Sequence, residues 1–267
     1  MRKYIYPILA ILVIVALYYA EDYADKQVEA YPDMSTETTK KTSAEFETSL
    51  LPTSTTGVIV NHAYYTLSYA EKHEQAEWVA YPLLKEHLTR NNFDRPDFVE
   101  DRSVATKSAD WRSYKGSGYD RGHLCPAGDR RFTFEAYHET FLTSNISPQN
   151  SDFNGGIWNK LEQKTRYWAK QKDGVYVVTG GVLKEGLPSI GVERVSVPDA
   201  FYKIVLDQTG GKYKAIAFLI PNKETNNSFY DYVTSIDAIE KETGIDFFPK
   251  LPSKIQEELE SKVNKKF

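Results

Sequence analysis

Two apolar runs separated by a glycine pair constrain the fold of this chain more than any other feature. Residues 197–206 and 214–220 are rich in β-branched and aromatic side chains, and Gly210-Gly211 lies between them. Such runs favour extended strands, and a glycine pair favours the tight turn of a hairpin. The sequence therefore predicts two antiparallel strands, the second of which ends at Pro221.

The remaining periodic segments predict a mixture of strands and helices. An aromatic content of 13% favours a core that contains β-structure. Alternating or continuous apolar runs predict further strands at residues 64–69, at 77–81 (ending before Pro82) and at 175–179. Helical patterns are expected at residues 83–88, 134–140, 153–168 and 230–243, the last stopped by Gly244. This mixture predicts an α+β fold.

The N-terminus predicts a segment that directs export. Met1-Arg2-Lys3 precedes an uncharged apolar run that reaches Ala20. A basic start followed by such a run is typical of a membrane anchor or a secretory signal. Tyr18-Tyr19 suits a membrane interface and no clear cleavage site follows, which favours the anchor. Both alternatives place the bulk of the protein outside the cytoplasm.

Composition divides the rest of the chain into three parts. Residues 21–57 are rich in Thr, Ser, Glu and Lys and are expected to form a low-complexity linker. Residues 58–252 carry the predicted strands and helices and form one domain. Residues 253–267 are expected to form a charged C-terminal helix at the periphery.

Charge and cysteine content limit the classes of function. The net charge of −4 gives no general attraction for nucleic acid, so any polyanion site needs a local basic cluster. Cys125 is the one cysteine, which excludes an intramolecular disulfide. We interpret Cys125 as a small buried apolar residue.

The segment Asp120-Arg121-Gly122-His123 gathers residue types that act on phosphate esters. Histidine transfers protons near neutral pH. Arginine donates paired hydrogen bonds to phosphate, and glycine lets the backbone approach a ligand closely. By contrast, His138 has no flanking acid or cation and is interpreted as an ordinary, partly exposed helical residue.

The helix expected at residues 153–168 has two distinct faces. Ile157, Leu161 and Trp168 fall in one stripe at 100° per residue, which predicts the core face. A second row, spaced by four residues, contains Asn154, Trp158, Glu162 and Arg166. On the helix alone, this row fits equally well a solvated edge with a weak Glu162–Arg166 ion pair or part of a functional site.

Taken in order, these motifs resemble the DNA/RNA non-specific endonuclease family, whose endonuclease G-like members belong to the ββα-metal (His-Me finger) superfamily. The resemblance runs from about residue 62 to residue 251 and is carried by residues 120–123, 144–149, 154–162, 197–203 and 243–248. It implies a central antiparallel β-sheet flanked by helices, with a ββα-metal catalytic core.

The resemblance also implies roles for individual residues. The motif histidine is the general base of the family, which assigns that role to His123. The asparagine that opens the helix is the direct protein ligand of Mg²⁺, and Mn²⁺ or another divalent cation can replace it; this residue is Asn154. The glutamate eight positions later holds metal-bound water, which corresponds to Glu162.

Further positions correspond to residues that contact or support the substrate. Asp120 and Arg121 match residues that support the histidine and the substrate, and Arg166 matches an arginine that contacts phosphate. Asn145 matches an asparagine near the metal site. An upstream arginine stabilises the transition state, for which Arg90 fits best by its place before Phe93, with Arg95 as the alternative.

The resemblance therefore predicts a Mg²⁺-dependent, sugar-non-specific endonuclease that hydrolyses DNA and RNA, single- or double-stranded. The membrane is an expected partner through the N-terminal segment, no small-molecule cofactor is expected, and the sequence leaves a homodimer open. Two alternatives remain: a catalytically silent nucleic-acid-binding module at the cell surface, and a phosphodiesterase for smaller substrates.

Overall fold

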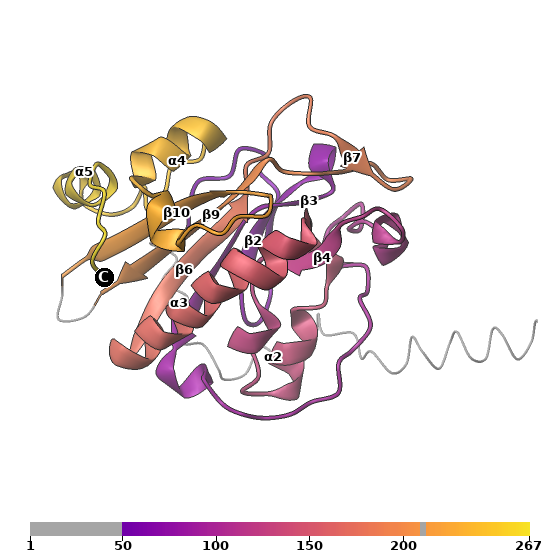
Figure 1. The fold of residues 1–267 in the computed structure, drawn as a ribbon, viewed down its shortest axis with the longest axis horizontal. Coiled ribbons are helices and arrows are strands. Elements are labelled where there is room, and N and C mark those ends of the chain that lie inside the picture. Colours follow the sequence, from indigo (N-terminus) through magenta and orange to yellow (C-terminus); the bar gives the residue numbers. More distant parts are fainter. Residues whose placement is uncertain (1–49, 209–211) are drawn as a thin grey trace, which may run out of the picture. The chain divides into compact units, whose positions relative to one another are not determined.

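The computed structural model describes residues 50–208 and 212–267 as one α+β domain (Figure 1). The predicted N-terminal segment, most of the predicted linker and the Gly210-Gly211 turn lie outside these residues. None of the helices within the described ranges has the length and apolar character needed to cross a membrane.

A seven-stranded sheet forms the centre of the domain. Its strand order is β1-β2-β3-β6-β9-β10-β11, and every neighbouring pair is antiparallel. Two small antiparallel pairs, β4-β5 and β7-β8, lie outside it. The strands are β1 (Ile59–Asn61), β2 (Thr66–Ala70), β3 (Gln75–Leu84), β4 (Asp120–His123), β5 (Ile146–Gln149), β6 (Gly174–Gly181), β7 (Ser189–Ile190), β8 (Val195–Ser196), β9 (Ala200–Asp207), β10 (Lys214–Pro221) and β11 (Val233–Thr234).

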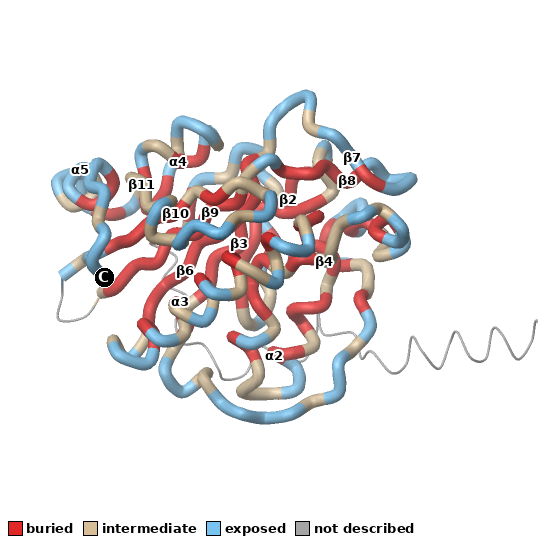
Figure 2. Tube along the Cα trace, in the orientation of Figure 1, coloured by how far each residue is buried: buried red, intermediate tan, exposed pale blue. Residues whose placement is uncertain are grey.

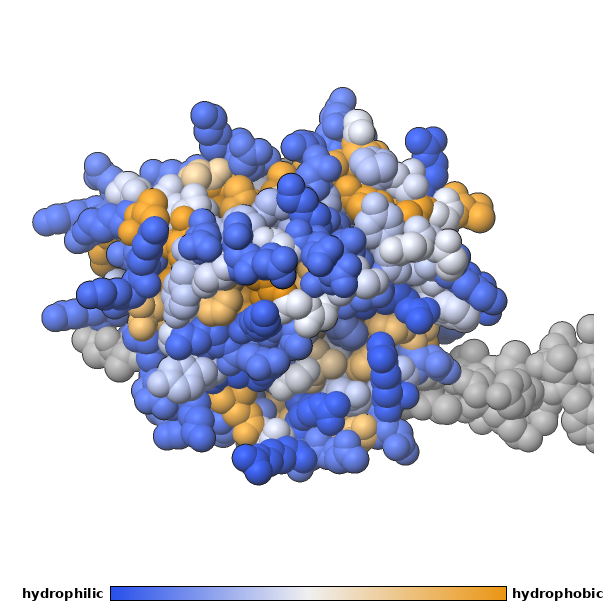
Figure 3. Space-filling view, in the orientation of Figure 1, coloured by the Kyte–Doolittle hydropathy of each residue, from blue (hydrophilic) through white to orange (hydrophobic). Residues whose placement is uncertain are grey.

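Helices cover both faces of the central sheet (Figures 1 and 2). The α-helices are α2 (Phe134–Glu139), α3 (Asn159–Gln171), α4 (Ile236–Thr243) and α5 (Ser253–Glu260). One core cluster joins α3 to residues such as Val177 and Val205, and another joins α4 and α5 to Val178 and Ile204. Successive residues of a strand point to opposite faces, so strands covered on both sides have continuous apolar runs. On the face seen in Figure 3 the surface is mostly hydrophilic, with apolar residues in small separate patches.

The prediction that the strand at residues 77–81 ends before Pro82 was wrong. Strand β3 continues to Leu84, and Pro82 pairs with Tyr176 of β6. On its other side β3 pairs with β2 only as far as Ala80, so Pro82 occupies an edge position where its missing N–H costs little. The helix predicted at 83–88 is reduced to a 3₁₀ turn at Lys85–His87.

The helix predicted at 230–243 starts later than expected. Residues Phe229–Tyr232 form a 3₁₀ turn and β11 follows, so α4 begins only after Ser235. The Ser235 hydroxyl accepts a hydrogen bond from Ala238 N (3.2 Å) and caps the helix. Its end is as predicted, because Gly244 takes the left-handed conformation with φ of 73°.

The folded domain begins earlier than residue 58. Leu50 is 1% exposed, Thr53 N donates to Asp246 O (2.9 Å), and Trp78 Nε1 donates to Thr53 O (2.8 Å). Residues 50–57 therefore belong to the domain rather than to the linker, because their backbone groups pair with distant segments. At the other end, the helix predicted at 253–267 stops at Glu260.

A buried charge network attaches α2 to the loop before β2. His62 Nε2 lies 2.9 Å from Asp101 Oδ2, and His62 Nδ1 lies 3.8 Å from Glu139 Oε1. The Glu139 carboxylate also accepts hydrogen bonds from the backbone N–H groups of Ala63 and Tyr64, both at 2.9 Å. Burial works to lower the pKa of His62, but the two carboxylates raise it above its ordinary value. His62 therefore lies between two acids that favour its protonated form.

Candidate active site

The motif at residues 120–123 forms strand β4, which pairs with β5. Strand β5 precedes α3 along the chain. His123 pairs with Ile146, and Asp120 pairs with Gln149. The two strands and the helix after them make a β-β-α unit, as the family resemblance implies (Figure 1). This unit brings the histidine motif to the start of the helix that carries Asn154.

Gly122 is required by close packing. A Cβ at this position would lie 2.2 Å from Cδ of Gln149, which is a severe clash. Gln149 is fully buried, and both polar atoms of its amide lack hydrogen-bond partners among the described residues. A side chain at residue 122 would therefore have to displace the buried Gln149 side chain.

A hydrogen bond joins the motif directly to the helix. Asn154 Nδ2 donates to Asp120 Oδ2 (2.9 Å), and Ser151 Oγ donates to Asp120 Oδ1 (2.8 Å). Because the amide nitrogen is engaged by Asp120, the Asn154 Oδ1 atom is turned away and can act as an oxygen ligand. Mg²⁺ prefers oxygen ligands and keeps most of its waters, so one amide oxygen next to the Asp120 carboxylate fits such a cation.

The start of this helix departs from α-geometry. Residues Phe153–Trp158 form a π-helical turn, and Asn159 N donates to Asn154 O five residues earlier. Gly156 interrupts the turn with φ of −95° and ψ of −106°. The predicted row therefore does not lie along one edge: Trp158 is fully buried, whereas Asn154 is half-buried. A π-turn rotates the residues before it relative to those after it, which the assumption of 100° per residue missed.

His123 is surrounded by aromatic rings. Its ring centroid lies 4.9 Å from that of Phe141 and 5.5 Å from that of Phe98. Burial, and then the positive charge of Arg95, lower the pKa of His123 to about 3. The imidazole is therefore neutral at physiological pH and can accept a proton.

Two arginines lie beside the same rings. The guanidinium carbon of Arg95 is 5.6 Å from the Phe98 centroid and 5.7 Å from the Phe141 centroid. Arg121 lies 4.8 Å from the Phe98 centroid, on the same aromatic support. Arg90 is exposed earlier in the loop, and the structure shows no corresponding contact between it and the rings around His123. Of the two upstream arginines considered, Arg95 is the one placed at the histidine.

The second part of the site is a charged group along α3. Arg166 Nη1 donates to Asp129 Oδ1 (2.7 Å), and the Tyr81 hydroxyl donates to Asp129 Oδ2 (2.9 Å). The ion pair of Arg166 is thus with Asp129 rather than with Glu162. Asp129 is 1% exposed, so this pair holds the guanidinium in a fixed position at the surface.

Glu162 lies in an environment of balanced charges. The pKa of Glu162 is raised to about 7, mainly by burial. The positive charges of Lys203 and Arg166 lower this pKa, and the negative charge of Asp129 raises it. Lys203 is 1% exposed, its ammonium lies 4.7 Å from the Trp158 centroid, and it has no hydrogen-bond partner among the described residues. Burial lowers the pKa of Lys203, and Glu162 is the strongest influence that raises it. The solvated-edge alternative does not fit this arrangement.

Asn145 is placed differently from the expectation. It is fully buried; its Oδ1 accepts from Cys125 N (2.8 Å), and its Nδ2 donates to Cys125 O and Thr140 O, both at 2.9 Å. With both ends of the amide bonded to backbone, Asn145 fixes the chain that follows His123 and has no polar group left for substrate. Cys125 is buried, which raises its pKa to about 12 and confirms its apolar character.

Sequence reasoning assigned no role to two residues of this site. Lys203 had a usable signal, because a lysine in the middle of an apolar strand is rarely buried without a purpose. Asp129 had none, since its partner Arg166 lies 37 residues away along the chain.

Comparisons with known proteins agree with this geometry. The model of a family described as DNA/RNA non-specific endonuclease matches residues 42–254. A nuclease of Nostoc sp. is 38% identical over 215 residues, covering 75% of this chain and 76% of that protein. The mitochondrial nuclease EXOG of Xenopus laevis is 34% identical over 214 residues, covering 72% of this chain but only 58% of its own length. Among solved structures, a crystal structure of the EndoG/EndoGI complex matches with a TM-score of 0.68 and 30% identity, covering 73% of this chain and 87% of that one.

Proposed function

Because the chain belongs to the DNA/RNA non-specific endonuclease family and is therefore a nuclease that hydrolyses phosphodiester bonds, we propose that it is a Mg²⁺-dependent enzyme that cleaves both DNA and RNA. The observation that supports this proposal best is the hydrogen bond between Asn154 Nδ2 and Asp120 Oδ2. It couples the histidine motif to the helix and leaves an amide oxygen free for a cation.

His123 is the general base of this proposal. Its neutral ring accepts a proton from the attacking water, and the rings of Phe98 and Phe141 hold it in place. Asn154 would hold the cation directly, with Glu162 acting through water. Bound Mg²⁺ supplies a Lewis acid that offsets negative charge on the phosphate and on the leaving oxygen.

Arginines supply the remaining positive charge. We assign the transition-state arginine to Arg95 rather than to Arg90, because Arg95 shares the aromatic support of His123. Arg121 lies on the same support, and Arg166 is held by Asp129 at the far end of the site. Guanidinium groups fixed in this way stabilise a phosphate without reorganising during the reaction.

The choice of substrate follows from the bond that is cut. Contacts to phosphate carry no base sequence, so a site built from arginines and one cation tolerates both sugars and many sequences. Export of the enzyme, through an anchor or a cleaved signal at residues 1–20, is part of the same proposal and is supported by the sequence of that segment.

Digestion of plasmid DNA and of RNA, with Mg²⁺ and then with excess EDTA, tests the function. We expect cleavage of both polymers with Mg²⁺, none with EDTA, and a fall of about 10²–10⁴-fold for His123→Ala. His138→Ala is the matched control, since it removes a histidine from α2 and is expected to keep full activity.

Four results would contradict the proposal. Cleavage that survives EDTA would exclude a required metal ion. Unimpaired activity of His123→Ala would exclude His123 as the general base. Tight binding without cleavage would indicate a silent binding module. Faster hydrolysis of a dinucleotide than of a polymer would change the substrate class to a small phosphodiester.

A further inference from the structure

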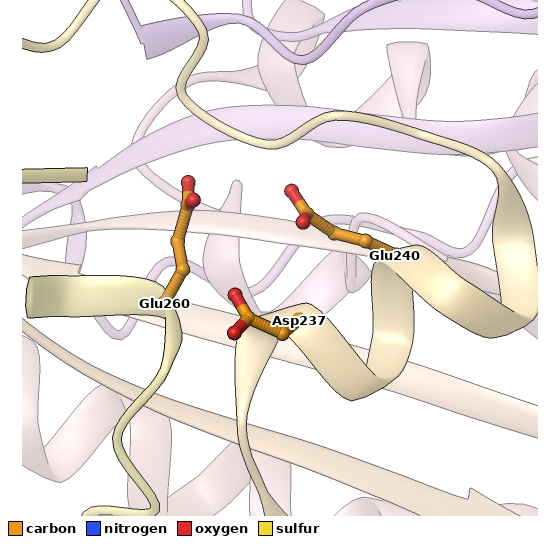
Figure 4. A group of neighbouring side chains, drawn as sticks. All are labelled: Asp237, Glu240 and Glu260. Atoms are coloured by element: carbon orange, nitrogen blue, oxygen red, sulfur yellow. The ribbon is translucent and has the colours of Figure 1, made fainter. Parts of the chain in front are cut away.

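Three carboxylates meet where α4 and α5 pack together, on the side of the molecule away from α3. Asp237 and Glu240 lie one turn apart on α4, and Glu260 is the last residue of α5 (Figure 4). One oxygen from each of the three lies within 4.8 Å of the others. These helices belong to the core cluster on the opposite face of the central sheet from α3, so the group is separate from the candidate active site.

Glu260 is the unusual member of this group. Glu260 is only 6% exposed, yet its Oε1 atom has no hydrogen-bond partner in the described parts of the chain. A buried carboxylate oxygen without a partner is costly and rare in folded proteins. Glu260 also ends α5, where the helix dipole already places negative charge, so the dipole does not compensate it.

The neighbours of Glu260 add to this cost. Burial, followed by the charges of Glu240, Asp246 and Asp237, raises the pKa of Glu260 to about 8, and a hydrogen bond from Gln256 acts in the opposite direction. Glu240 Oε1 is occupied by Phe247 N (2.8 Å), so its other oxygen is left to face the group. The arrangement therefore needs either a proton or a cation between the carboxylates.

The shape of the group favours a cation. Asp237 is exposed and Glu240 is half-buried, so the group is open to solvent on the α4 side and closed by Glu260 beneath. Three carboxylate oxygens from two helices, completed by water, suit Ca²⁺, which accepts irregular coordination and six to eight oxygens. Mg²⁺ demands a stricter octahedron and fits two independent helices less well.

We propose that Asp237, Glu240 and Glu260 form a Ca²⁺ site that fastens α5 to α4, independent of the cation held at Asn154. Leu259, next to Glu260, is buried in the same core as Ile239 of α4. Bound Ca²⁺ neutralises the repulsion that opposes this packing and so stabilises the C-terminal part of the domain.

Calcium titration of the full chain by isothermal calorimetry, in an Asn154→Ala background that removes the other proposed cation site, tests this inference. We expect one Ca²⁺ per chain in Asn154→Ala, and affinity at least about 10-fold weaker once Glu260→Gln is added, since a charged ligand is lost. Adding Glu257→Gln instead is the matched control, because Glu257 is an exposed acid on the same helix. Asp237→Asn, at an exposed position with little risk to folding, should also weaken binding.

Thermal unfolding in the same background gives a second readout. With 10 mM Ca²⁺ we expect Tm to rise by roughly 3 °C or more in Asn154→Ala, and not after addition of Glu260→Gln. Equal Ca²⁺ binding with and without Glu260→Gln would overturn the proposal. A Tm that rises as pH falls from 8.5 to 6 but does not respond to Ca²⁺ would also overturn it, by showing that the group holds only a proton.

Discussion

Replacement of Asp120 by asparagine perturbs the hydrogen bond that orients the amide of Asn154. The wild-type carboxylate accepts from Asn154 Nδ2 at 2.9 Å and from Ser151 Oγ at 2.8 Å. Asparagine has the same shape but no charge, and its own NH₂ group competes for the position that Asn154 Nδ2 now occupies. The amide of Asn154 then loses its single orientation, and its oxygen faces the cation only part of the time.

The size of the effect follows from the type of bond. A hydrogen bond to a charged group contributes about 1.5–3 kcal/mol, and the lower end applies because Asp120 and Asn154 are only half-buried. A loss of about 1.4 kcal/mol is a factor of ten in affinity. Residues that orient a metal ligand typically change affinity by about 10–100-fold. We therefore expect Asp120→Asn to need about tenfold more Mg²⁺ for half-maximal cleavage, with kcat at saturating Mg²⁺ within about threefold of wild type.

The assay is cleavage of a fluorescent duplex across a Mg²⁺ titration. Asp152→Asn is the charge-matched control, since it removes one exposed acid near the same helix start and should leave the Mg²⁺ requirement unchanged. Ser151→Ala removes only the second hydrogen bond of Asp120 and should have an intermediate effect. The reasoning would be refuted if Asp120→Asn reduced kcat at saturating Mg²⁺ as strongly as His123→Ala while the Mg²⁺ requirement stayed constant.

Three further predictions follow from the surroundings of the site. Arg95→Ala should lower kcat/KM by about 10²-fold and Arg90→Ala by less than about threefold. A larger loss of steady-state cleavage for Arg90→Ala than for Arg95→Ala would instead identify Arg90 as the transition-state arginine. The raised pKa of His62 means that its ion pairs contribute stability fully below about pH 6.5 and lose it as pH rises through the folded-state pKa. Urea unfolding should therefore show a larger loss of stability between pH 6.5 and 8.5 in wild type than in His62→Gln, and equal slopes would contradict this. Lys203→Met removes the strongest influence that lowers the pKa of Glu162, so the acid limb of the pH–rate profile should move to higher pH. An unshifted acid limb would show that Lys203 does not act on Glu162.

Local patterns predicted much of the fold. Apolar runs located the strands at the centre of the sheet, and the hydrophobic stripe of Ile157, Leu161 and Trp168 is the core face of the helix, with exposures of 3%, 0% and 4%. The errors occurred where a single residue type was given too much weight. Pro82 was taken to end a strand, although pairing on one side tolerates it.

The sequence by itself determined the chemistry of this protein. The motifs at residues 120–123, 144–149, 154–162, 197–203 and 243–248, taken in order, identified the family, because each motif is a short run of the chain. Tertiary structure alone decided which side chains lie near His123. Arg95 rather than Arg90 stands at His123, since rings from different segments support it, and Asn145 serves the backbone rather than the substrate.

The same reason applies to the buried charges. Asp129 meets Arg166, and Lys203 lies beneath Trp158, because α3 packs across the sheet and brings distant segments together. The three acids at α4 and α5 likewise become a group only when the two helices pack. Burial, which sets the cost of a charge and the pKa of each acid, arises only after the chain has folded, so no local pattern contains it.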